Sequence, residues 1–310
     1  TSIKAFAETM THGVEKRLAR WKGGTELDIG DEMMALAQHN IIKTVFGPDF
    51  EDGSGELARA ITTRKKYVEH VHFSLLPFSE YLPSKLRREY QQARKRIDAT
   101  ITREIDKRRA APEPSHDMLS LLMHAKYDDG TGMTDQQIRD EFLTLFSAGY
   151  ETIGEALTWT WYLLSQHPEV EARFLGELRE VLRGRVPGSD DVSKLPYTAM
   201  ILAESMRLYS PTWIFIRMAR QDAVLPSGFT IPAGSKLYLC QYVMHRNARY
   251  WPNPECFDPE RFAEPAKKAR PQFAYFPFGG GIRVCIGEAF AKMECILTLA
   301  SIAQRFALTL

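Results

Sequence analysis

Apolar residues recur three or four positions apart over long segments in the first two thirds of the chain. This spacing places them on one face of an α-helix. Helices are therefore predicted over residues 3–21, 28–46, 56–73 and 84–111. The last of these is rich in Lys and Arg with interleaved Glu and Asp, which favours a solvated face with ion pairs one turn apart over a basic binding surface.

A longer helix, of about thirty residues, is predicted over residues 135–167. Thr134 and Gln137 have the spacing of a capping box at its start, and Pro168 marks its end. Its middle, residues 142–161, is apolar nearly all round. We therefore expect this part of the helix to be buried in the centre of the molecule.

The apolar period shifts towards two after Pro211. Turn signals occur at residues 226–228 and 232–234, and a strand is predicted over 236–242. The predicted fold class is therefore mainly α with a small β part. No Gly/Ser linker or low-complexity stretch divides the chain, so residues 1–310 are expected to form a single domain.

The composition is that of a globular protein with ample apolar material for a core, since 44% of the 310 residues are hydrophobic and 25% are charged. A net charge of +1 gives no indication of nucleic-acid binding. No apolar run reaches the length needed to span a bilayer, and no signal-peptide pattern opens the chain. The four cysteines, Cys240, Cys256, Cys285 and Cys295, show no Cys-x-x-Cys pairing, which fits a reducing, cytoplasmic compartment.

One run near the C-terminus carries the clearest chemistry: Phe278-Gly-Gly-Gly281-Ile-Arg283-Val-Cys285-Ile-Gly287. A helix is predicted to begin at residue 288, so its free N–H groups and positive dipole end would face the sulfur of Cys285 and stabilise a thiolate. A thiolate is the axial ligand with which haem iron favours splitting of dioxygen. Phe278 can exclude water beside the sulfur, and Arg283 is positioned to meet a haem propionate.

The glycines of this run, including Gly279, Gly281 and Gly287, remove side chains where the backbone turns tightly and lies close to a flat macrocycle. The alternative is a glycine-rich loop with a buried free cysteine, a common position for a free thiol. A dinucleotide fingerprint is excluded, because Gly279-x-Gly281-x-x-Val284 lacks the third glycine.

This run resembles the haem-ligand loop of the cytochrome P450 family, Phe-x-x-Gly-x-Arg-x-Cys-x-Gly, and all five constant positions match. The resemblance implies a P450-like helical fold with a long central helix over haem b, whose iron is bound by Cys285. It extends over nearly all of the chain. Relative to the family, residues 1–310 are expected to be a haem-binding catalytic domain that is incomplete at both ends, without the family's N-terminal part and last C-terminal strands.

The segment Ala148-Gly-Tyr-Glu151-Thr152 lies inside the long predicted helix. Ala148 and Thr152 share one helix face, and Gly149 allows another group close to the backbone. The purely structural interpretation is that the hydroxyl of Thr152 donates a hydrogen bond to the carbonyl of Ala148 and that Glu151 caps a local group. The resemblance instead implies the family's oxygen-binding groove, in which Glu151 and Thr152 relay protons.

Charged residues outside the loop are also explained by the resemblance. Glu204 and Arg207 lie one turn apart in an apolar segment, which suggests burial, and with Arg261 they match the family cluster that maintains the fold. Arg217 matches the arginine that binds the other propionate, and the alternative interpretation is an edge-strand arginine. His245 is expected to be a structural hydrogen-bonding residue and not an iron ligand.

By position in the family, the wall of the substrate site is formed by Leu145, Ala148, Thr212, Ile214 and Phe215. This wall is mostly apolar, so a hydrophobic small molecule is expected as substrate. The apolar loop over residues 72–83 is either a packed connector or, as in the family, a lid over the substrate channel.

The resemblance implies a haem-thiolate monooxygenase, and the long helix and the haem loop look nearest to those of bacterial members. No flavin or nicotinamide motif occurs, so electrons are expected from a ferredoxin- or flavodoxin-type donor and its reductase. Two alternatives remain open. One is a peroxide-using variant, which Glu151 and Thr152 argue against because that variant carries Arg and Pro there. The other is a truncated or non-catalytic haem-binding scaffold.

Overall fold

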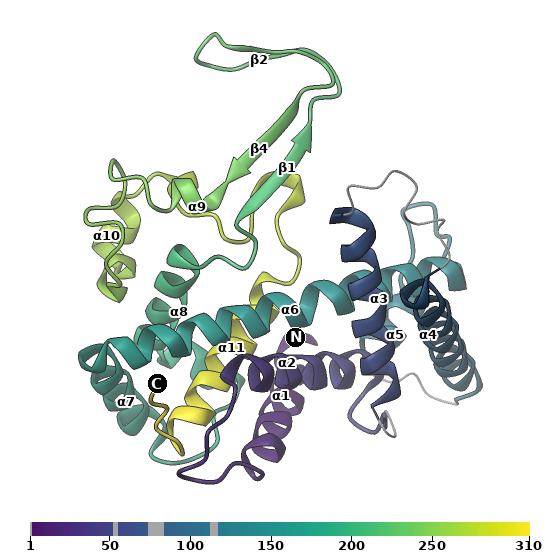
Figure 1. Cartoon of the computed structure of the whole chain (residues 1–310), viewed down its shortest axis with the longest axis horizontal. Helices are drawn as coiled ribbons and strands as arrows, with labels where there is room; N and C mark the ends of the chain where they lie inside the picture. Colours follow the sequence, from purple (N-terminus) through teal and green to yellow (C-terminus); the bar gives the residue numbers. More distant parts are fainter. Residues whose placement is uncertain (1, 52–54, 74–83, 112–116) are drawn as a thin grey trace. The chain divides into compact units, whose positions relative to one another are not determined.

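The computed structural model describes residues 2–51, 55–73, 84–111 and 117–310. The chain forms two compact units, one of Thr1–Ala37 with Glu151–Leu310 and the other of Gln38–Tyr150. Helices dominate both units, and two short sheets lie in the first, so the predicted mainly α fold with a small β part is confirmed (Figure 1). That the whole chain acts as a single domain stays a prediction.

The long helices of the unit Gln38–Tyr150 were predicted from the sequence, but its short helix over residues 118–124 was not. α3 (Glu56–Phe73) and α4 (Lys85–Ala110) pack against each other, with the rings of Tyr67 and Tyr90 stacked at 4.2 Å. α5 (Met118–His124) follows α4. Residues 74–83, which include most of the apolar loop interpreted as connector or lid, lie outside the described residues.

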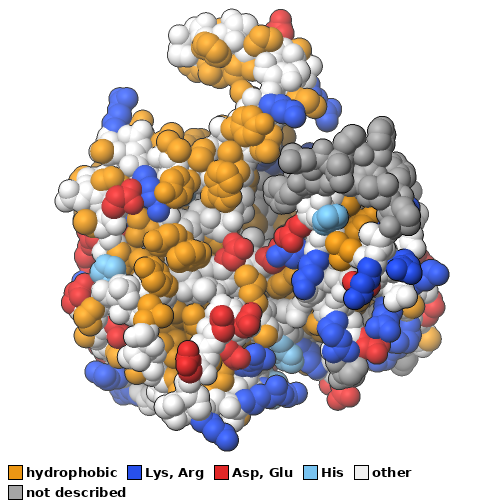
Figure 2. All heavy atoms as spheres, in the orientation of Figure 1, with side chains coloured by type: hydrophobic (Ala, Val, Ile, Leu, Met, Phe, Trp, Pro, Cys, Tyr) orange, Lys and Arg blue, Asp and Glu red, His pale blue; other side chains and the backbone are white. Residues whose placement is uncertain are grey.

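The basic face of α4 is solvated, as predicted. Its buried side chains form one stripe, and on the outside Lys85 pairs with Glu89, and Arg94 with Asp98, four residues apart. Lys and Arg side chains gather on the surface that α3 and α4 form (Figure 2). Ion pairs of this kind support a helix by a few tenths of a kcal/mol each, about 0.2–0.5.

Two helices contribute to both units, α2 (Ile29–Phe46) and α6 (Asp135–Gln166). The capping box of α6 is confirmed, because the N–H of Thr134 donates to Oε1 of Gln137 at 2.8 Å and the N–H of Gln137 donates to Oγ1 of Thr134 at 3.3 Å. The helix ends just before His167 and Pro168, where α7 (Pro168–Leu182) begins. These local signals therefore set both ends of α6 correctly.

The predicted burial of residues 142–161 is only partly right. One stripe of α6 is buried, which includes Phe142, Phe146, Ile153 and Leu157, but Ala148 is exposed and Trp159 is 39% exposed. The indole of Trp159 stacks on Tyr209 at 4.1 Å between ring centroids. Large rings on this face therefore cover one another and leave part of their area in solvent, which the apolar count alone could not reveal.

The helix that is buried all round is α11 (Glu288–Ala303). Every residue from 293 to 302 is buried, and the helix packs against α1 (Ser2–Leu18) and α8 (Pro196–Leu208) (Figure 1). An apolar circumference of this kind belongs to a central helix. Among the described residues, no helix is long and apolar enough to cross a membrane.

In the described part of the chain, the sheets are two antiparallel strand pairs. β1 (Ile214–Met218) pairs with β4 (Lys236–Cys240), with Ile214 opposite Cys240, and β2 (Ala223–Val224) pairs with β3 (Thr230–Ile231). The predicted strand 236–242 ends early, because α9 (Gln241–Met244) begins directly after Cys240. Hydrophobic side chains lie at the surface of these strands (Figure 2), and those of β1 and β4 include Ile216, Met218 and Tyr238.

Candidate active site

The loop that carries Cys285 is held by its own backbone. The N–H of Cys285 donates to the carbonyl of Phe278 at 2.9 Å, and the N–H of Val284 donates to the carbonyl of Gly281 at 3.1 Å. Gly287 is the N-cap of α11, and no side chain caps this helix end. Cys285 is exposed and stands two residues before the N-cap, so the unsatisfied N–H groups of the first turn can stabilise negative charge near its sulfur.

Two glycines of the loop have a conformation that L-residues rarely adopt. Gly279 has φ +76° and Gly281 has φ +67°. These values support the predicted tight turns, because only glycine enters this region without strain. At Gly287, a Cβ atom would lie 3.8 Å from the sulfur of Cys285, so its absence leaves space beside the thiol.

The other loop residues have defined surroundings. Phe278 is half-buried, and Nζ of Lys292 lies 5.3 Å from the centre of its ring. Arg283 is exposed and belongs to the short 3₁₀ turn Gly281–Arg283. Sequence analysis did not single out Ile282 and Ile286, which are 101% and 90% exposed and flank the motif's Arg and Cys at its variable positions.

Arg217 lies on β1 and is exposed. Its Nη1 donates to the carbonyl of Ile216 at 2.9 Å, and its guanidinium lies 5.6 Å from the ring of Phe215. Asp222, five residues later, stabilises the turn before β4, since its Oδ1 accepts a hydrogen bond from the N–H of Ala233 at 2.7 Å. The guanidinium of Arg217 is thus accessible to an anionic group.

Glu151 and Thr152 are half-buried on α6, and Oε1 of Glu151 is itself buried. The space beside Gly149 is taken by Ile41, whose Cδ1 would be 3.0 Å from a Cβ atom there. Gly154, which sequence analysis did not single out, approaches α2 still more closely, because a Cβ atom there would lie 2.6 Å from Sδ of Met34. The predicted close approach at Gly149 is therefore made by a core side chain.

Of the residues assigned to the substrate wall, Ala148 is exposed and the others are half-buried. Thr212, Ile214 and Phe215 follow α8 and enter β1, and the ring of Phe215 lies against the cysteine loop, 3.4 Å from where a Cβ atom of Gly279 would be. Leu145 and Ala148 lie on the other half of α6, in the unit Gln38–Tyr150. The structure thus brings β1 and the cysteine loop together.

The side chains of Glu204 and Arg207 are completely buried, as their apolar neighbours suggested. Arg207 donates to both carboxylate oxygens of Glu204 at 2.7 and 2.8 Å and to three backbone carbonyls, those of His245, Pro254 and Cys256. Nε of Arg261 lies 3.3 Å from Oε1 of Glu204. Burial raises the pKa of Glu204, while hydrogen bonds from Arg207 oppose that rise.

His245 is fully buried and accepts a hydrogen bond from the N–H of Phe276 at 3.0 Å. Burial, with the nearby charge of Arg207, lowers the pKa of His245 to about 3, so the ring is neutral near pH 7. Gln241 adds a second attachment, because its Nε2 donates to the carbonyl of Phe276 at 3.2 Å. The expected structural hydrogen bond of His245 is therefore found, and it anchors the segment that enters the cysteine loop.

The residues present fit a haem group. Cys285 offers one exposed sulfur donor, which suits a metal whose equatorial ligands come from a macrocycle. Gly279, Gly281 and Gly287 leave the loop without side chains at these positions, and Arg217 and Arg283 are exposed cations of the same unit that can pair with carboxylates.

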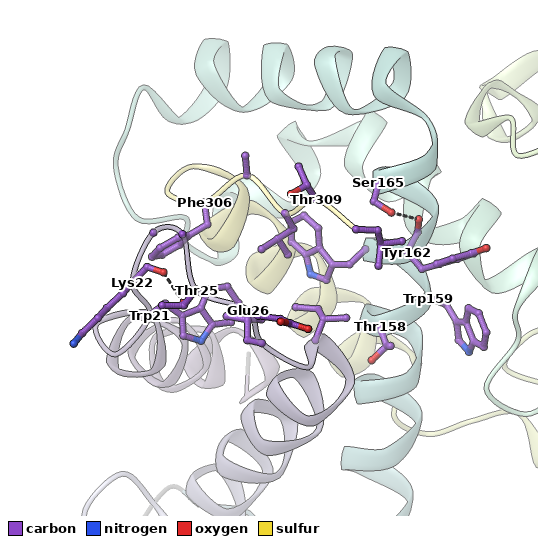
Figure 3. Close-up of a pocket in the computed structure, with 18 residues that line it drawn as sticks. Trp21, Lys22, Thr25, Glu26, Thr158, Trp159, Tyr162, Ser165, Phe306 and Thr309 are labelled. Atoms are coloured by element: carbon purple, nitrogen blue, oxygen red, sulfur yellow. Dashed lines mark hydrogen bonds between the residues drawn. The ribbon is translucent and has the colours of Figure 1, made fainter.

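A cavity of about 620 Å³ lies elsewhere in this unit. Its lining does not include Cys285 or any other residue of the loop. Figure 3 shows residues that line it, from the segment after α1, from α6 and from the C-terminal segment: Trp21, Lys22, Thr158, Tyr162, Phe306 and Thr309.

The sequence and the fold of the chain are similar to those of known proteins. A sequence model of the cytochrome P450 family matches residues 2–310. Cyclooctat-9-en-7-ol 5-monooxygenase of Streptomyces melanosporofaciens is 32% identical over 308 residues, which cover 99% of this chain and 67% of that protein. Pentalenene oxygenase of Streptomyces avermitilis is 30% identical over 311 residues, 100% of this chain and 69% of that protein.

Among solved structures, the haem domain of cytochrome P450DA superposes with a TM-score of 0.89 at 28% identity, covering 98% of this chain and 67% of that chain. The chain thus spans about two thirds of the length of the proteins it matches. The chain belongs to the cytochrome P450 family, and its predicted class, a monooxygenase with a haem-thiolate cofactor, is confirmed.

Proposed function

We propose that Cys285 is the axial thiolate ligand of haem b and that the enzyme inserts one oxygen atom of dioxygen into a hydrophobic small molecule. When bound, haem supplies the iron at which dioxygen is activated, and thiolate donation favours O–O cleavage. The observation that carries the proposal is the exposed sulfur of Cys285 just before α11, in a loop that turns at two left-handed glycines.

The loop and β1 hold the cofactor in this proposal. Arg217 and Arg283 bind the two propionates, because an exposed guanidinium pairs with a carboxylate through two N–H groups. Phe278 limits the access of water to the sulfur, and the loop glycines keep side chains away from the ring face. Glu204, Arg207 and Arg261 act at a distance, by keeping the scaffold under the loop folded.

Glu151 and Thr152 supply protons. The half-buried carboxylate of Glu151 can carry a proton from solvent to the site, and the hydroxyl of Thr152 can hold a donor beside bound oxygen. Ala148 lies one turn before Thr152 on α6 and leaves that face open with its small side chain. The pair also disfavours the peroxide-using alternative, which needs no proton relay of this kind.

The substrate binds against Leu145, Thr212, Ile214 and Phe215. Their apolar character suits a hydrophobic ligand, and two relatives are named for action on cyclooctat-9-en-7-ol and on pentalenene, which supports a hydrophobic substrate here. Electrons come from a ferredoxin- or flavodoxin-type donor with its reductase. The enzyme works in the cytoplasm, and residues 1–310 act as one haem-binding catalytic domain.

A difference spectrum of the reduced, carbon-monoxide-bound protein tests the proposal. A thiolate-type red-shifted band supports Cys285 as ligand. Failure to take up haem would contradict the proposal and would instead support a truncated, inactive scaffold. Product formation with peroxide alone, at the rate seen with an electron donor, would support the peroxide-using enzyme.

A further inference from the structure

Two aromatic rings lie against consecutive glycines of the cysteine loop. A Cβ atom on Gly279 would lie 3.4 Å from Cζ of Phe215, which belongs to β1. A Cβ atom on Gly280 would lie 2.5 Å from Cε1 and 3.3 Å from Cζ of Phe273, which belongs to the 3₁₀ turn Gln272–Ala274. All of these residues lie in the same compact unit.

The need for glycine differs at the two positions. Gly279 has φ +76°, so an L-residue would be strained there whatever the space around it. Gly280 has φ −173°, which is extended backbone that any residue adopts. At Gly280 the requirement is therefore steric, because the ring of Phe273 occupies the position that a side chain would take.

Phe273 is not a core residue. Its side chain is 55% exposed, whereas its neighbour Ala274 is buried. A large apolar ring that stays half in solvent contributes little to the core, yet this ring reaches the cysteine loop. The ring therefore packs against Gly280 and not in the core.

The glycine pair is linked to Cys285 through the backbone. Gly279 follows Phe278, whose carbonyl accepts a hydrogen bond from the N–H of Cys285 at 2.9 Å. The N–H of Gly279 donates to the carbonyl of Phe276 at 2.9 Å. Gly280 precedes Gly281, whose carbonyl accepts the N–H of Val284 at 3.1 Å. A shift of the pair would therefore move both hydrogen bonds that hold the cysteine.

We propose that Phe273 and Phe215 clamp Gly279 and Gly280, one ring against each glycine, and thereby set the position of the Cys285 sulfur. Phe273 is then a positioning residue for the thiolate. This role rests on the proposed function, in which Cys285 is the axial ligand. Phe273 is not part of the proposed substrate wall and acts only through the loop, whereas Phe215 also belongs to that wall.

A double-mutant cycle on the haem-loaded protein tests the clamp at Gly280, where alanine adds steric conflict without backbone strain. Hydrogen–deuterium exchange of the Cys285 and Gly279 amides measures opening of the loop. We expect Phe273→Ala and Gly280→Ala each to raise this exchange about tenfold, which corresponds to about 1.4 kcal/mol. In the double variant Gly280→Ala adds nothing further, because the ring it displaces is already absent.

Two controls bracket this result. Phe273→Tyr keeps the ring edge and should exchange like the wild type. Phe229→Ala removes another exposed ring, 66% exposed in the turn region of β2 and β3, and should leave the loop unchanged. Additive effects of Phe273→Ala and Gly280→Ala, or unchanged exchange in Phe273→Ala, would overturn the clamp.

The midpoint potential of the iron and the fraction of thiolate-type carbon-monoxide band give a second readout. Phe273→Ala should shift the midpoint potential and lower the fraction of the thiolate-type band. Phe273→Tyr should leave both at their wild-type values. The same exchange measurement in a Cys285→Ser background separates the two proposals. If Phe273→Ala and Gly280→Ala remain non-additive but Cys285→Ser keeps the thiolate-type spectrum, the ligand assignment is contradicted and the clamp is not. If the two substitutions are additive and Cys285→Ser loses that spectrum, the clamp is contradicted and the ligand assignment is not.

Discussion

Nε2 of His245 accepts a hydrogen bond from the backbone N–H of Phe276, two residues before Phe278 and the start of the haem-loop motif. His245 is fully buried and belongs to the segment after α9, while Phe276 enters the loop that ends at Cys285. This bond requires a neutral ring nitrogen as acceptor. The attachment of the loop is therefore sensitive to protonation.

The pH dependence of stability follows from this bond. The pKa of His245 is lowered from 6.5 to about 3 by burial first and by the charge of Arg207 second. Above pH 6.5 the ring is neutral in the folded and unfolded states, and the bond contributes fully. As the pH falls towards 3, the unfolded state binds the proton first and stability is lost, by at most about 1.4 kcal/mol per pH unit.

Urea unfolding between pH 7 and pH 4.5 measures this loss. His245→Gln keeps an acceptor for Phe276 but does not titrate, so its unfolding free energy should fall less steeply with decreasing pH than that of the wild type. Equal slopes in the two proteins would show that His245 is not the titrating group.

The buried cluster of Glu204, Arg207 and Arg261 should be essential for folding. Truncation of Arg207 to Ala leaves Glu204 as a buried charge and removes hydrogen bonds to three carbonyls, so we expect a loss of about 3–5 kcal/mol and poor haem content. Arg261→Ala should cost less, because its contact with Glu204 is longer, at 3.3 Å. Urea unfolding and haem absorbance check both.

An exposed pair gives the matched control for this cluster. Glu264 and Lys267 form an ion pair in which both side chains are more than half exposed. Glu264→Ala should leave the free energy of unfolding nearly unchanged, because an exposed ion pair contributes little to stability. A haem-replete Glu204→Ala variant as stable as Glu264→Ala would show that the cluster is dispensable.

Gly154→Ala should be destabilising although alanine favours helices. Its Cβ atom would lie 2.6 Å from Sδ and 3.1 Å from the Cα of Met34, and the backbone of α2 cannot easily retreat. Overpacking of this kind costs about 1–3 kcal/mol. Gly176, inside α7, has no atom within 4 Å of its Cβ position, so Gly176→Ala should instead stabilise by up to about 1 kcal/mol. Thermal unfolding of the two variants would refute this account if their midpoints moved in the same direction.

Local signals in the sequence predicted the elements well, while long-range contacts could not be inferred. Thr134, Gln137 and Pro168 marked both ends of α6, because caps and prolines act within a few residues. The approach of Gly154 to Met34 joins residues 120 positions apart in the chain, and nothing in the spacing of either residue indicates it. The partial exposure of α6 was missed for the same reason, since it depends on Tyr209, which stacks on Trp159.

The candidate site shows the same difference between local sequence signals and long-range contacts. The motif around Cys285 was recognisable because its chemistry needs particular residues at short spacing. Phe273 was not recognisable, because its role depends on the position of its ring over Gly280, which only the folded chain defines.

Thr152→Ala should change the fate of electrons and leave the fold nearly intact, because alanine is a good helix former. Without the hydroxyl, peroxide should be released at the expense of product, and Glu151→Gln should slow proton supply because an amide does not relay protons as a carboxylate does. Product formed per reduced nicotinamide consumed, with peroxide assayed alongside, measures this coupling. Unchanged coupling in Thr152→Ala would remove this residue from the mechanism.

The identity of the iron ligand is tested most directly by the carbon-monoxide difference spectrum of Cys285→Ser beside that of Cys295→Ser. Cys295 is buried within α11, where burial raises the pKa of its thiol, so it is a poor thiolate donor. We predict that Cys285→Ser loses the thiolate-type band and that Cys295→Ser keeps it. Retention of that band in Cys285→Ser, with its loss in Cys295→Ser, would contradict the assignment of Cys285 as the haem ligand.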